Sequence, residues 1–260
     1  GNQTKLFTPR LAKYLNNQIS ITAFYGLQGS MLTANGIKIY PPYKTPYGND
    51  IMSARAEMDG ADAIISLLDA WVINPKDISL PWFPWFPIDR EPIPTNVFAS
   101  VRGSTKGITM SKFGQRMAQA AGLETWYVPH GVDTNVFRPR DMLTAREKIG
   151  MPKDKFVVGM VAANKGNPPR KAFYEQIAAF AALRRKHEDV LLYLHTDDGS
   201  RGGDVVNLVQ YAIRVGLKPG RDFVFCDQYQ YSIGFPDEYM VDMYSAFDVL
   251  LMVSKGEGFG

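Results

Sequence analysis

The sequence predicts an α/β protein in which helices cover parallel β-sheets. Short apolar or β-branched segments alternate with amphipathic helical segments along nearly the whole chain. Residues 61–68 form a near-continuous apolar run, broken only by Asp62, which is typical of a strand covered on both faces. Because strands joined by helices favour right-handed crossovers, we expect neighbouring strands to run parallel.

Length and composition favour two domains and exclude several classes of protein. The chain has 260 residues, of which 45% are hydrophobic and 21% charged, which suits two domains of ordinary size. The formal net charge is only +3 and its cations are dispersed, so no nucleic-acid partner is expected. Cys226 is the only cysteine, and we expect it to be a small buried side chain in a reducing, cytoplasmic compartment. No run approaches 18 apolar residues, so no membrane span is expected.

The first half of the chain predicts the following elements. We expect a helix that Thr4 caps and that runs through Leu15, and a second helix over residues 50–58 that Asp50 caps. Strands are expected over residues 19–25, 37–40, 61–68, 107–110 and 125–128, with a helix over 111–121.

Residues 80–94 interrupt this alternation with five prolines and four large aromatic residues. Proline removes ladder donors and is excluded from helix interiors, so we expect an extended loop with at most a short strand near residues 87–88. Exposed aromatic rings on a stiff loop would suit a ligand wall. Alternatively, Trp82 and Trp85 simply cover the end of the sheet.

The second half repeats the alternation more regularly. Strands are expected over residues 155–162, 190–195, 222–225 and 249–253, and helices over 204–215 and 236–247. Phe173, Ile177, Phe180 and Leu183 recur at helical spacing and predict a further helix. It follows a polar loop, residues 163–171, that carries three cations. We place the domain boundary between residues 138 and 139.

Two motifs carry a resemblance to a known family. Residues 129–139 read Pro-His-Gly-Val-Asp-Thr-Asn-Val-Phe-Arg-Pro, and residues 254–260 read Ser-Lys-Gly-Glu-Gly-Phe-Gly. In this order and at this spacing they resemble the retaining GT-B glycosyltransferases that use nucleotide-sugar donors. The resemblance implies two Rossmann-like parallel-sheet domains, an acceptor-side domain over residues 1–138 and a nucleotide-sugar-binding domain over 139–260. It also implies that both domains are incomplete at the chain termini, before Gly1 and after Gly260.

The resemblance implies transfer of a hexose from a nucleotide sugar to an acceptor hydroxyl, with retention of anomeric configuration. The nucleotide sugar is then a co-substrate, and no other cofactor or metal is expected. A carbohydrate, a lipid-linked group or a protein would be the acceptor.

Donor-site residues are expected at strand ends of the second domain, where open α/β sheets bind ligands. Lys171 matches the lysine that binds the donor diphosphate in the family, but the arginine of that loop falls on Asn164 or Lys165, which is a departure. Negative charge that develops on the leaving phosphate needs cations and backbone dipoles. In the second domain the expected donor-binding residues are Asn164, Lys165, Arg170, Lys171, Asp227, Gln228, Glu257, Gly258, Phe259 and Gly260. The resemblance adds Gly1 and Asn2, in a loop of the first domain whose backbone approaches the donor phosphates. A solvated basic loop is the alternative for residues 163–171.

Three residues are expected to act in catalysis, namely Glu257, Lys171 and Asp89. The resemblance implies that Glu257 contacts the transferred sugar, where a carboxylate also stabilises an oxocarbenium-like centre. Alternatively, its charge only complements a helix N-terminus. Acceptor-side residues are expected at Asp69, Trp71, Trp82 and Trp85. For Asp69 and Trp71 the alternatives are a helix cap and core packing.

Two other functions stay open on the sequence. A sugar-nucleotide epimerase of the same fold would need carboxylates and histidines around the sugar, and a non-catalytic fragment would bind the nucleotide sugar without turnover. If the helix after Gly260 is missing, we expect little activity and self-association through exposed apolar area.

Overall fold

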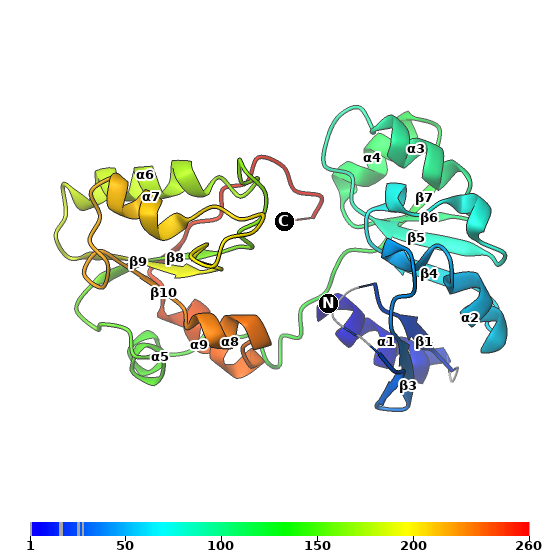
Figure 1. Cartoon of the computed structure of the whole chain (residues 1–260), viewed down its shortest axis with the longest axis horizontal. Coiled ribbons are helices and arrows are strands. Elements are labelled where there is room, and N and C mark those ends of the chain that lie inside the picture. Colours follow the sequence, from blue (N-terminus) through cyan, green and yellow to red (C-terminus); the bar gives the residue numbers. More distant parts are fainter. Residues whose placement is uncertain (1, 16–17, 25–26, 28, 260) are drawn as a thin grey trace. The chain divides into compact units, whose positions relative to one another are not determined.

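The computed structural model of the chain (Figure 1) describes residues 2–15, 18–24, 27 and 29–259. The chain forms two compact units. Unit 1 is Gly1–Gly131 together with Glu257–Gly260, and unit 2 is Val132–Gly256. The predicted domains, 1–138 and 139–260, differ from these units in that residues 132–138 fall in unit 2 and residues 257–260 in unit 1. Each unit contains its own β-sheet structure.

Unit 1 contains two sheets. Its helices are α1 (Asn2–Leu15), α2 (Met52–Met58), α3 (Thr95–Arg102) and α4 (Lys112–Ala120). Its strands are β1 (Ser20–Thr22), β2 (Leu32–Ala34), β3 (Ile37–Tyr40), β4 (Ile64–Leu67), β5 (Trp82–Phe86), β6 (Gly107–Thr109) and β7 (Thr125–Tyr127). One sheet has the order β1-β3-β2, and the other has the order β4-β5-β6-β7 with every pair parallel.

Strand β2 was not predicted, and it pairs antiparallel with β3. The two strands are joined by Asn35 and Gly36, whose φ angles are 51° and 77°. Positive φ at both central residues defines the two-residue hairpin turn that Asn-Gly favours. The Asn-Gly pair was therefore a usable hairpin signal in the sequence.

Strand β5 corrects the prediction that residues 80–94 are mostly loop. It lies between β4 and β6, although Pro84 cannot donate a ladder hydrogen bond. Thr105, which precedes β6, donates its N–H to the Trp82 carbonyl and accepts the Trp82 N–H at its hydroxyl. Because backbone groups point alternately to the two sides of a strand, the nitrogen of Pro84 also faces β6. The β5–β6 ladder begins only at Trp85, so the missing donor falls where no ladder has formed.

The aromatic rings of β5 belong to the core of unit 1. Trp82 and Trp85 are 2% and 4% exposed, and Phe86 is fully buried. The indole N–H of Trp82 donates to the Ser66 hydroxyl at 2.9 Å, and that of Trp85 donates to a backbone carbonyl. The prediction of an exposed aromatic wall is wrong for Trp82 and Trp85, and the packing alternative describes them.

Two predicted helix starts are also wrong. Thr4 lies inside α1, where its carbonyl accepts a hydrogen bond from the Thr8 hydroxyl, so it is no N-cap. Helix α2 begins at Met52, and the Asp50 carboxylate bonds the Thr45 hydroxyl and the N–H groups of Lys44 and Thr45. Short polar side chains hydrogen-bond readily within loops, and here that alternative replaces the cap.

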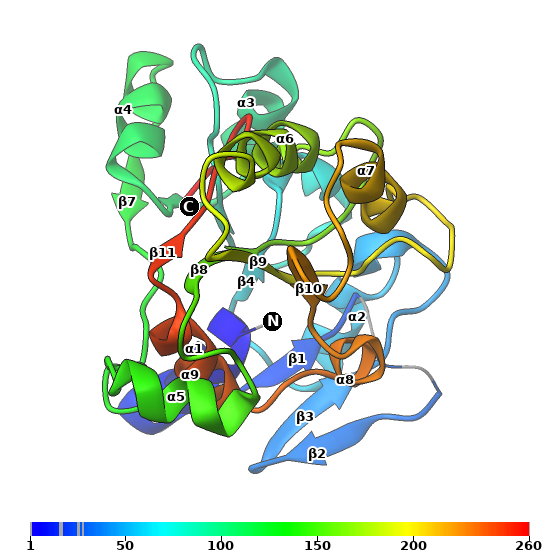
Figure 2. The same ribbon diagram turned by 90° about the vertical axis from the view of Figure 1, so that its left-hand side faces the viewer.

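Unit 2 is a four-stranded parallel sheet covered on both faces. Its strands are β8 (Phe156–Val161), β9 (Val190–His195), β10 (Phe223–Phe225) and β11 (Val249–Leu250), in the order β10-β9-β8-β11. Its helices are α5 (Met142–Ile149), α6 (Phe173–Arg184), α7 (Leu208–Arg214), α8 (Gln228–Ile233) and α9 (Asp237–Ala246). Figures 1 and 2 show α6 and α7 on one face of this sheet, with α5, α8 and α9 on the other.

Alternate residues of the strands supply the two cores of unit 2. On one face Val158, Leu192 and Leu194 pack among buried residues of α6 and α7. On the other face Val157 and Tyr193 pack among buried residues of α5 and α9. The period of two along each strand explains why these strands read as unbroken apolar runs.

Gly159 and Cys226 mark tight places in the second of these cores. A Cβ added at Gly159 would overlap the ring of Phe247, which is 7% exposed. Cys226 is 4% exposed, as predicted for a small buried side chain, and burial raises the pKa of its thiol to about 11. The thiol therefore packs as a neutral group.

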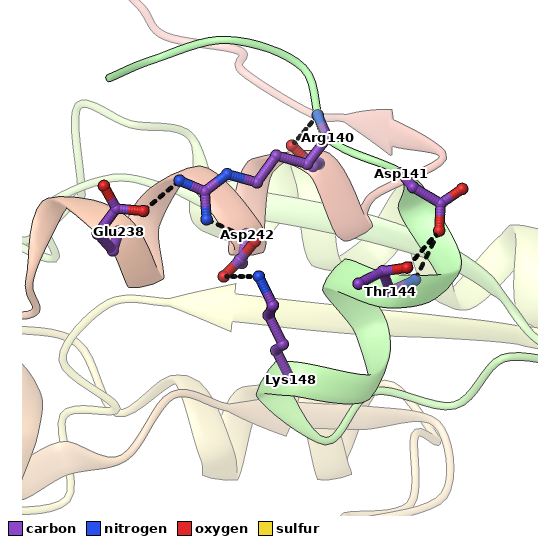
Figure 3. Close-up of polar contacts among 7 residues, drawn as sticks. Arg140, Asp141, Thr144, Lys148, Glu238 and Asp242 are labelled. Carbon is purple, nitrogen blue, oxygen red and sulfur yellow. Dashed lines mark hydrogen bonds and ion pairs between the residues drawn. The ribbon is translucent and has the colours of Figure 1, made fainter. Parts of the chain in front are cut away.

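A network of ionic contacts joins the start of unit 2 to α9 (Figure 3). Arg140 pairs with Glu238 and donates to the Asp242 carboxylate at 2.9 Å, while its backbone N–H donates to the Ser245 hydroxyl. Lys148 of α5 reaches Asp242 at 3.6 Å. Because the Asp242 side chain is only 9% exposed, these cations compensate a carboxylate that is largely desolvated.

We expect Arg140→Ala to lower the free energy of unfolding by about 1–2 kcal/mol, because Asp242 keeps only the more distant Lys148. Lys153→Ala is the matched control, since its pair with Glu147 is exposed and should contribute under about 0.5 kcal/mol. Urea denaturation followed by circular dichroism measures both. Equal effects of the two substitutions would contradict a stabilising role for the Arg140 network.

Candidate functional site

The candidate donor site of unit 2 lies at the carboxyl ends of β8 and β11. Loop 163–171 follows β8 and leads into α6, and residues 253–256 follow β11. Gln176, 4% exposed, joins these segments because its amide donates to the carbonyls of Lys171 and Val253, at 2.7 and 3.0 Å. Its amide oxygen accepts the Val253 N–H at 3.3 Å. Gln176 therefore holds loop 163–171 against residues 253–256.

Arg170 makes the second connection between these segments. Its carbonyl accepts hydrogen bonds from the Lys255 N–H at 2.9 Å and from the Ser254 hydroxyl, and its guanidinium donates to the Gly256 carbonyl. Lys255 also pairs with Glu175 of α6 at 2.9 Å, and this contact lowers the pKa of the Glu175 carboxyl. Three basic residues, Arg170, Lys171 and Lys255, therefore lie on adjoining stretches of backbone, with Glu175 beside Lys255.

Helix α6 begins directly behind this group of cations. Its N-cap is Ala172, which has left-handed φ and ψ angles of 49° and 38° and no side chain to cap the helix. The first N–H groups of α6 are thus not capped from the N-cap position. A left-handed alanine costs about 1 kcal/mol or more, so the surrounding contacts must hold it in place. Cations beside a helix N-terminus form an arrangement suited to a phosphate.

The two alternatives for the arginine position of this loop differ sharply in placement. Asn164 is 3% exposed, and its amide donates to the carbonyls of Asp197 and Val206 and accepts the Val206 N–H. Both polar atoms of its side chain are therefore bonded to backbone within unit 2, which corrects the prediction that Asn164 contacts the donor. Lys165 is exposed. The predicted helix over 204–215 begins later than expected, since α7 starts at Leu208 and is capped by Asn207. Val206, just before this start, is held by the Asn164 amide instead.

Asp227 and Gln228 lie at the carboxyl end of β10, as predicted, but their side chains serve local structure. The Asp227 carboxylate caps α8 by accepting the Gln230 N–H at 2.7 Å. The Gln228 amide donates to the carbonyls of Thr196 and Cys226 and accepts the Asp198 N–H. These bonds tie the ends of β9 and β10 together.

Glu257, Gly258 and Phe259 group with unit 1. A Cβ at Gly258 would overlap Pro87, so only glycine allows this close approach. The Phe259 ring lies 4.8 Å from that of His130, whose Nε2 atom is buried without a hydrogen-bond partner among the described residues. Burial lowers the pKa of His130. Gly1, Gly260 and the side chain of Asn2, all predicted to bind the donor, lie outside the described residues.

A cavity of about 330 Å³ in unit 1 brings together three predicted residues, Asp69, Trp71 and Asp89. Asp69 follows β4, and Asp89 follows β5, so both lie beyond the carboxyl ends of neighbouring parallel strands. Asp69 makes no capping hydrogen bond to the turn after it, and Trp71 is 52% exposed. Neither the cap nor the core-packing alternative therefore describes these two residues.

Sequence reasoning missed two residues that organise the candidate donor site, Gln176 and Lys255. Gln176 is one of the buried residues of α6. A glutamine on the apolar face of a predicted helix indicates a side chain with hydrogen-bond partners inside the fold. Lys255 stands within the recognised motif without having been assigned a role. Among the described residues, no group of three or more His, Cys, Asp or Glu side chains could hold a metal ion.

Comparison with known proteins identifies the fold. No family model matches the sequence, and no curated protein matches it. Among solved structures, the sucrose-phosphate synthase of Thermosynechococcus elongatus superposes with a TM-score of 0.72 at 15% identity, over 99% of this chain and 71% of that one. The E. coli trehalose-6-phosphate structure bound with UDP-2-fluoro glucose gives 0.61 at 10% identity, over 97% and 76%. WaaG, a glycosyltransferase involved in lipopolysaccharide biosynthesis, gives 0.65 at 13% identity, over 98% and 72%.

The chain has the GT-B fold. Its neighbours of that fold are glycosyltransferases, as the two sequence motifs indicated. The GT-B neighbours are matched over nearly the whole of this chain, so the likeness includes both units. Within the described part of the chain, no helix is long and apolar enough to cross a membrane.

Proposed function

We propose that the chain is a retaining glycosyltransferase that transfers a hexose from a nucleotide sugar to an acceptor hydroxyl. One observation carries the proposal: Arg170, Lys171 and Lys255, the last of them paired with Glu175, lie on segments that are hydrogen-bonded together beside the N-terminus of α6, at the carboxyl ends of β8 and β11. Cations and helix dipoles at such a place stabilise the charge that develops on a departing diphosphate. The GT-B fold supports the same reading, since one neighbour was bound with UDP-2-fluoro glucose.

Within this proposal, Lys171 balances charge on the leaving phosphate and Glu257 contacts the transferred sugar. Asp89 acts on the acceptor side. The nucleotide sugar is the co-substrate, and no further cofactor is proposed. We also retain the cytoplasmic location, which the single, buried Cys226 thiol supports.

A transfer assay tests the proposed reaction directly. The chain is incubated with labelled UDP-, GDP- and ADP-hexoses and a panel of sugar acceptors, and the product anomer is assigned by NMR. We expect a product that keeps the anomeric configuration of the donor. An inverted product would contradict retention, an epimerised nucleotide sugar would support an epimerase, and binding without turnover would support a non-catalytic fragment.

Lys171→Ala should weaken nucleoside-diphosphate binding about tenfold, because one charge-assisted contact to the diphosphate is lost. Lys186→Ala is the matched control, since it removes the same charge from the other end of α6. Calorimetric titration with UDP, GDP and ADP measures both variants. If the two variants bind equally well, Lys171 does not contact the diphosphate.

A further inference from the structure

A cavity of about 270 Å³ lies in unit 2 at the opposite end of the sheet from the candidate donor site. Its lining comes from the end of α6 and the residues after it, from the turn after α7, and from the residues just before β10. These segments lie at the amino ends of β9 and β10, whereas loop 163–171 and residues 253–256 follow the carboxyl ends of β8 and β11. A ligand in this cavity would therefore be separate from the donor.

Three guanidinium groups line this cavity, those of Arg184, Arg185 and Arg221. Two of them are fixed by Asp222, whose side chain is only 1% exposed. One oxygen of its carboxylate accepts the Nε–H groups of Arg184 and Arg221, at 2.8 and 2.7 Å. The other oxygen accepts from Arg221 Nη2 at 2.8 Å and from the Lys218 backbone N–H at 2.9 Å. The Arg221 guanidinium also lowers the pKa of Asp222, so the carboxylate stays ionised.

The Asp222 carboxylate leaves part of each guanidinium group without an acceptor. A carboxylate offers about four lone-pair sites, and the four hydrogen bonds to Asp222 fill them. Arg184 makes one further bond, from Nη1 to the His187 carbonyl at 3.3 Å. Arg185 is exposed and its side chain makes no hydrogen bond or ion pair with any residue that the structure describes. N–H donors of three guanidinium groups therefore remain available around one cavity.

The charges of the lining are positive overall. Asp222 balances one of the three guanidinium groups, and Glu188, which lies on the same lining, balances another. Lys155 adds a further cation, since its Nζ atom donates to the Arg221 carbonyl at 2.9 Å. The C-terminus of α6 also favours cations, but Arg184, in the last turn of that helix, already meets this need. The remaining positive charge favours an anionic ligand.

We infer that this cavity binds a phosphate group, either free phosphate or the phosphate of a small monoester. Guanidinium groups bind phosphate oxygens through paired, charge-assisted hydrogen bonds. Because the buried Asp222 already fixes two of these groups, they lose little freedom when the ligand binds. A cavity of about 270 Å³ is small for an organic ligand and suits a phosphate with a short organic group.

Equilibrium binding tests the inference. Inorganic phosphate, sn-glycerol 3-phosphate and glucose 6-phosphate are titrated into the native chain by calorimetry at low salt, where charge pairs are least screened. We expect saturable binding of at least one probe with a Kd of about 1 mM. Arg185→Ala should weaken this binding about tenfold, because charge-assisted contacts are lost. Glu188→Gln should tighten it about twofold, because a like charge is removed from the lining.

Lys186→Ala is the matched control, because Lys186 is the next residue, is exposed and carries the same charge, but does not line the cavity. It should bind the probes as the native chain does. Labelling with phenylglyoxal, mapped by mass spectrometry, locates the ligand. Added phosphate should slow the labelling of Arg185 and leave unchanged that of Arg102, an exposed arginine of unit 1.

The inference is overturned if no probe binds saturably up to about 50 mM, or if Arg185→Ala binds the probes as tightly as the native chain. Either order of affinity among the probes supports the site and identifies its ligand. Tighter binding of inorganic phosphate indicates free phosphate, and tighter binding of an ester indicates a phosphomonoester.

Lys171→Ala separates this cavity from the proposed donor site. The phosphate probes should bind Lys171→Ala as tightly as the native chain, and UDP, GDP and ADP should bind Arg185→Ala as tightly. If the probes lose affinity in Lys171→Ala and not in Arg185→Ala, they occupy the donor site and the inference fails. If they bind through Arg185 while no nucleoside diphosphate binds, the phosphate cavity stands and the proposed function fails.

Discussion

Replacement of Trp82 by alanine should lower the free energy of unfolding by about 3–5 kcal/mol, the usual cost of truncating a large buried aromatic ring. Trp82 is 2% exposed and packs with Met52 and Ile73. Its loss also removes the hydrogen bond to the buried Ser66 hydroxyl, which then lacks its donor. Urea denaturation followed by circular dichroism measures the change.

Trp126→Ala is the control for this prediction. Trp126 lies in the same sheet and stacks on Phe83 at 5.7 Å, but it is 52% exposed, so its truncation should cost under about 1 kcal/mol. Trp82→Phe should fall between the two, because it keeps most of the buried area. If Trp82→Ala were no more destabilising than Trp126→Ala, the placement of β5 in the core would be wrong.

Histidine 195 should make the chain less stable at acid pH by about 3 kcal/mol between pH 7 and pH 4. His195 lies at the end of β9 and is 7% exposed, and the rings of Tyr231 and Phe235 are 5.6 and 4.9 Å from its own. Burial lowers the pKa of His195 from 6.5 to about 4. Its stabilising effect is therefore complete above pH 6.5, and is lost between pH 6.5 and about 4, where the unfolded chain binds the proton first.

His195→Phe isolates this effect, because phenylalanine fills the same aromatic surroundings and carries no titratable group. The Nδ1 atom of His195 has no hydrogen-bond partner among the described residues, so the substitution removes no contact that they make to it. Thermal unfolding at pH 7 and at several values down to pH 4 should give a steeper loss in the native chain than in the variant. Parallel curves would show that His195 does not stay neutral in the folded state.

The sheet of unit 2 could be predicted from sequence because both of its faces are covered. Strand β9 runs from Val190 to His195 as predicted, and every residue in it is buried, so its apolar run has no interruption to misread. The four parallel strands of unit 1 are less uniform. Strand β5 was missed because a proline normally excludes a central strand. Pro84 is tolerated here because the pairing of β5 with β6 begins only at Trp85, one residue after the proline.

The candidate sites were predictable in outline and less so in detail. Lys171 lies on the loop after β8, as the strand pattern predicts, whereas Asp89 follows β5, a strand that the sequence did not predict. The role of Asn164 could not be read, because its backbone partner Val206 is 42 residues away and their contact depends on the folded loop. Trp71 and Trp82 look alike in sequence, yet the first is on a cavity rim and the second is core.

The close approach of Phe247 to Gly159 predicts a pattern among related sequences. Since any Cβ at position 159 would overlap the ring, a larger residue there demands a smaller one at position 247. The two positions should therefore vary together, and a variant library with both sites randomised should return small–large or large–small pairs. Such pairs would report the register between β8 and the chain segment after α9 without a further structure.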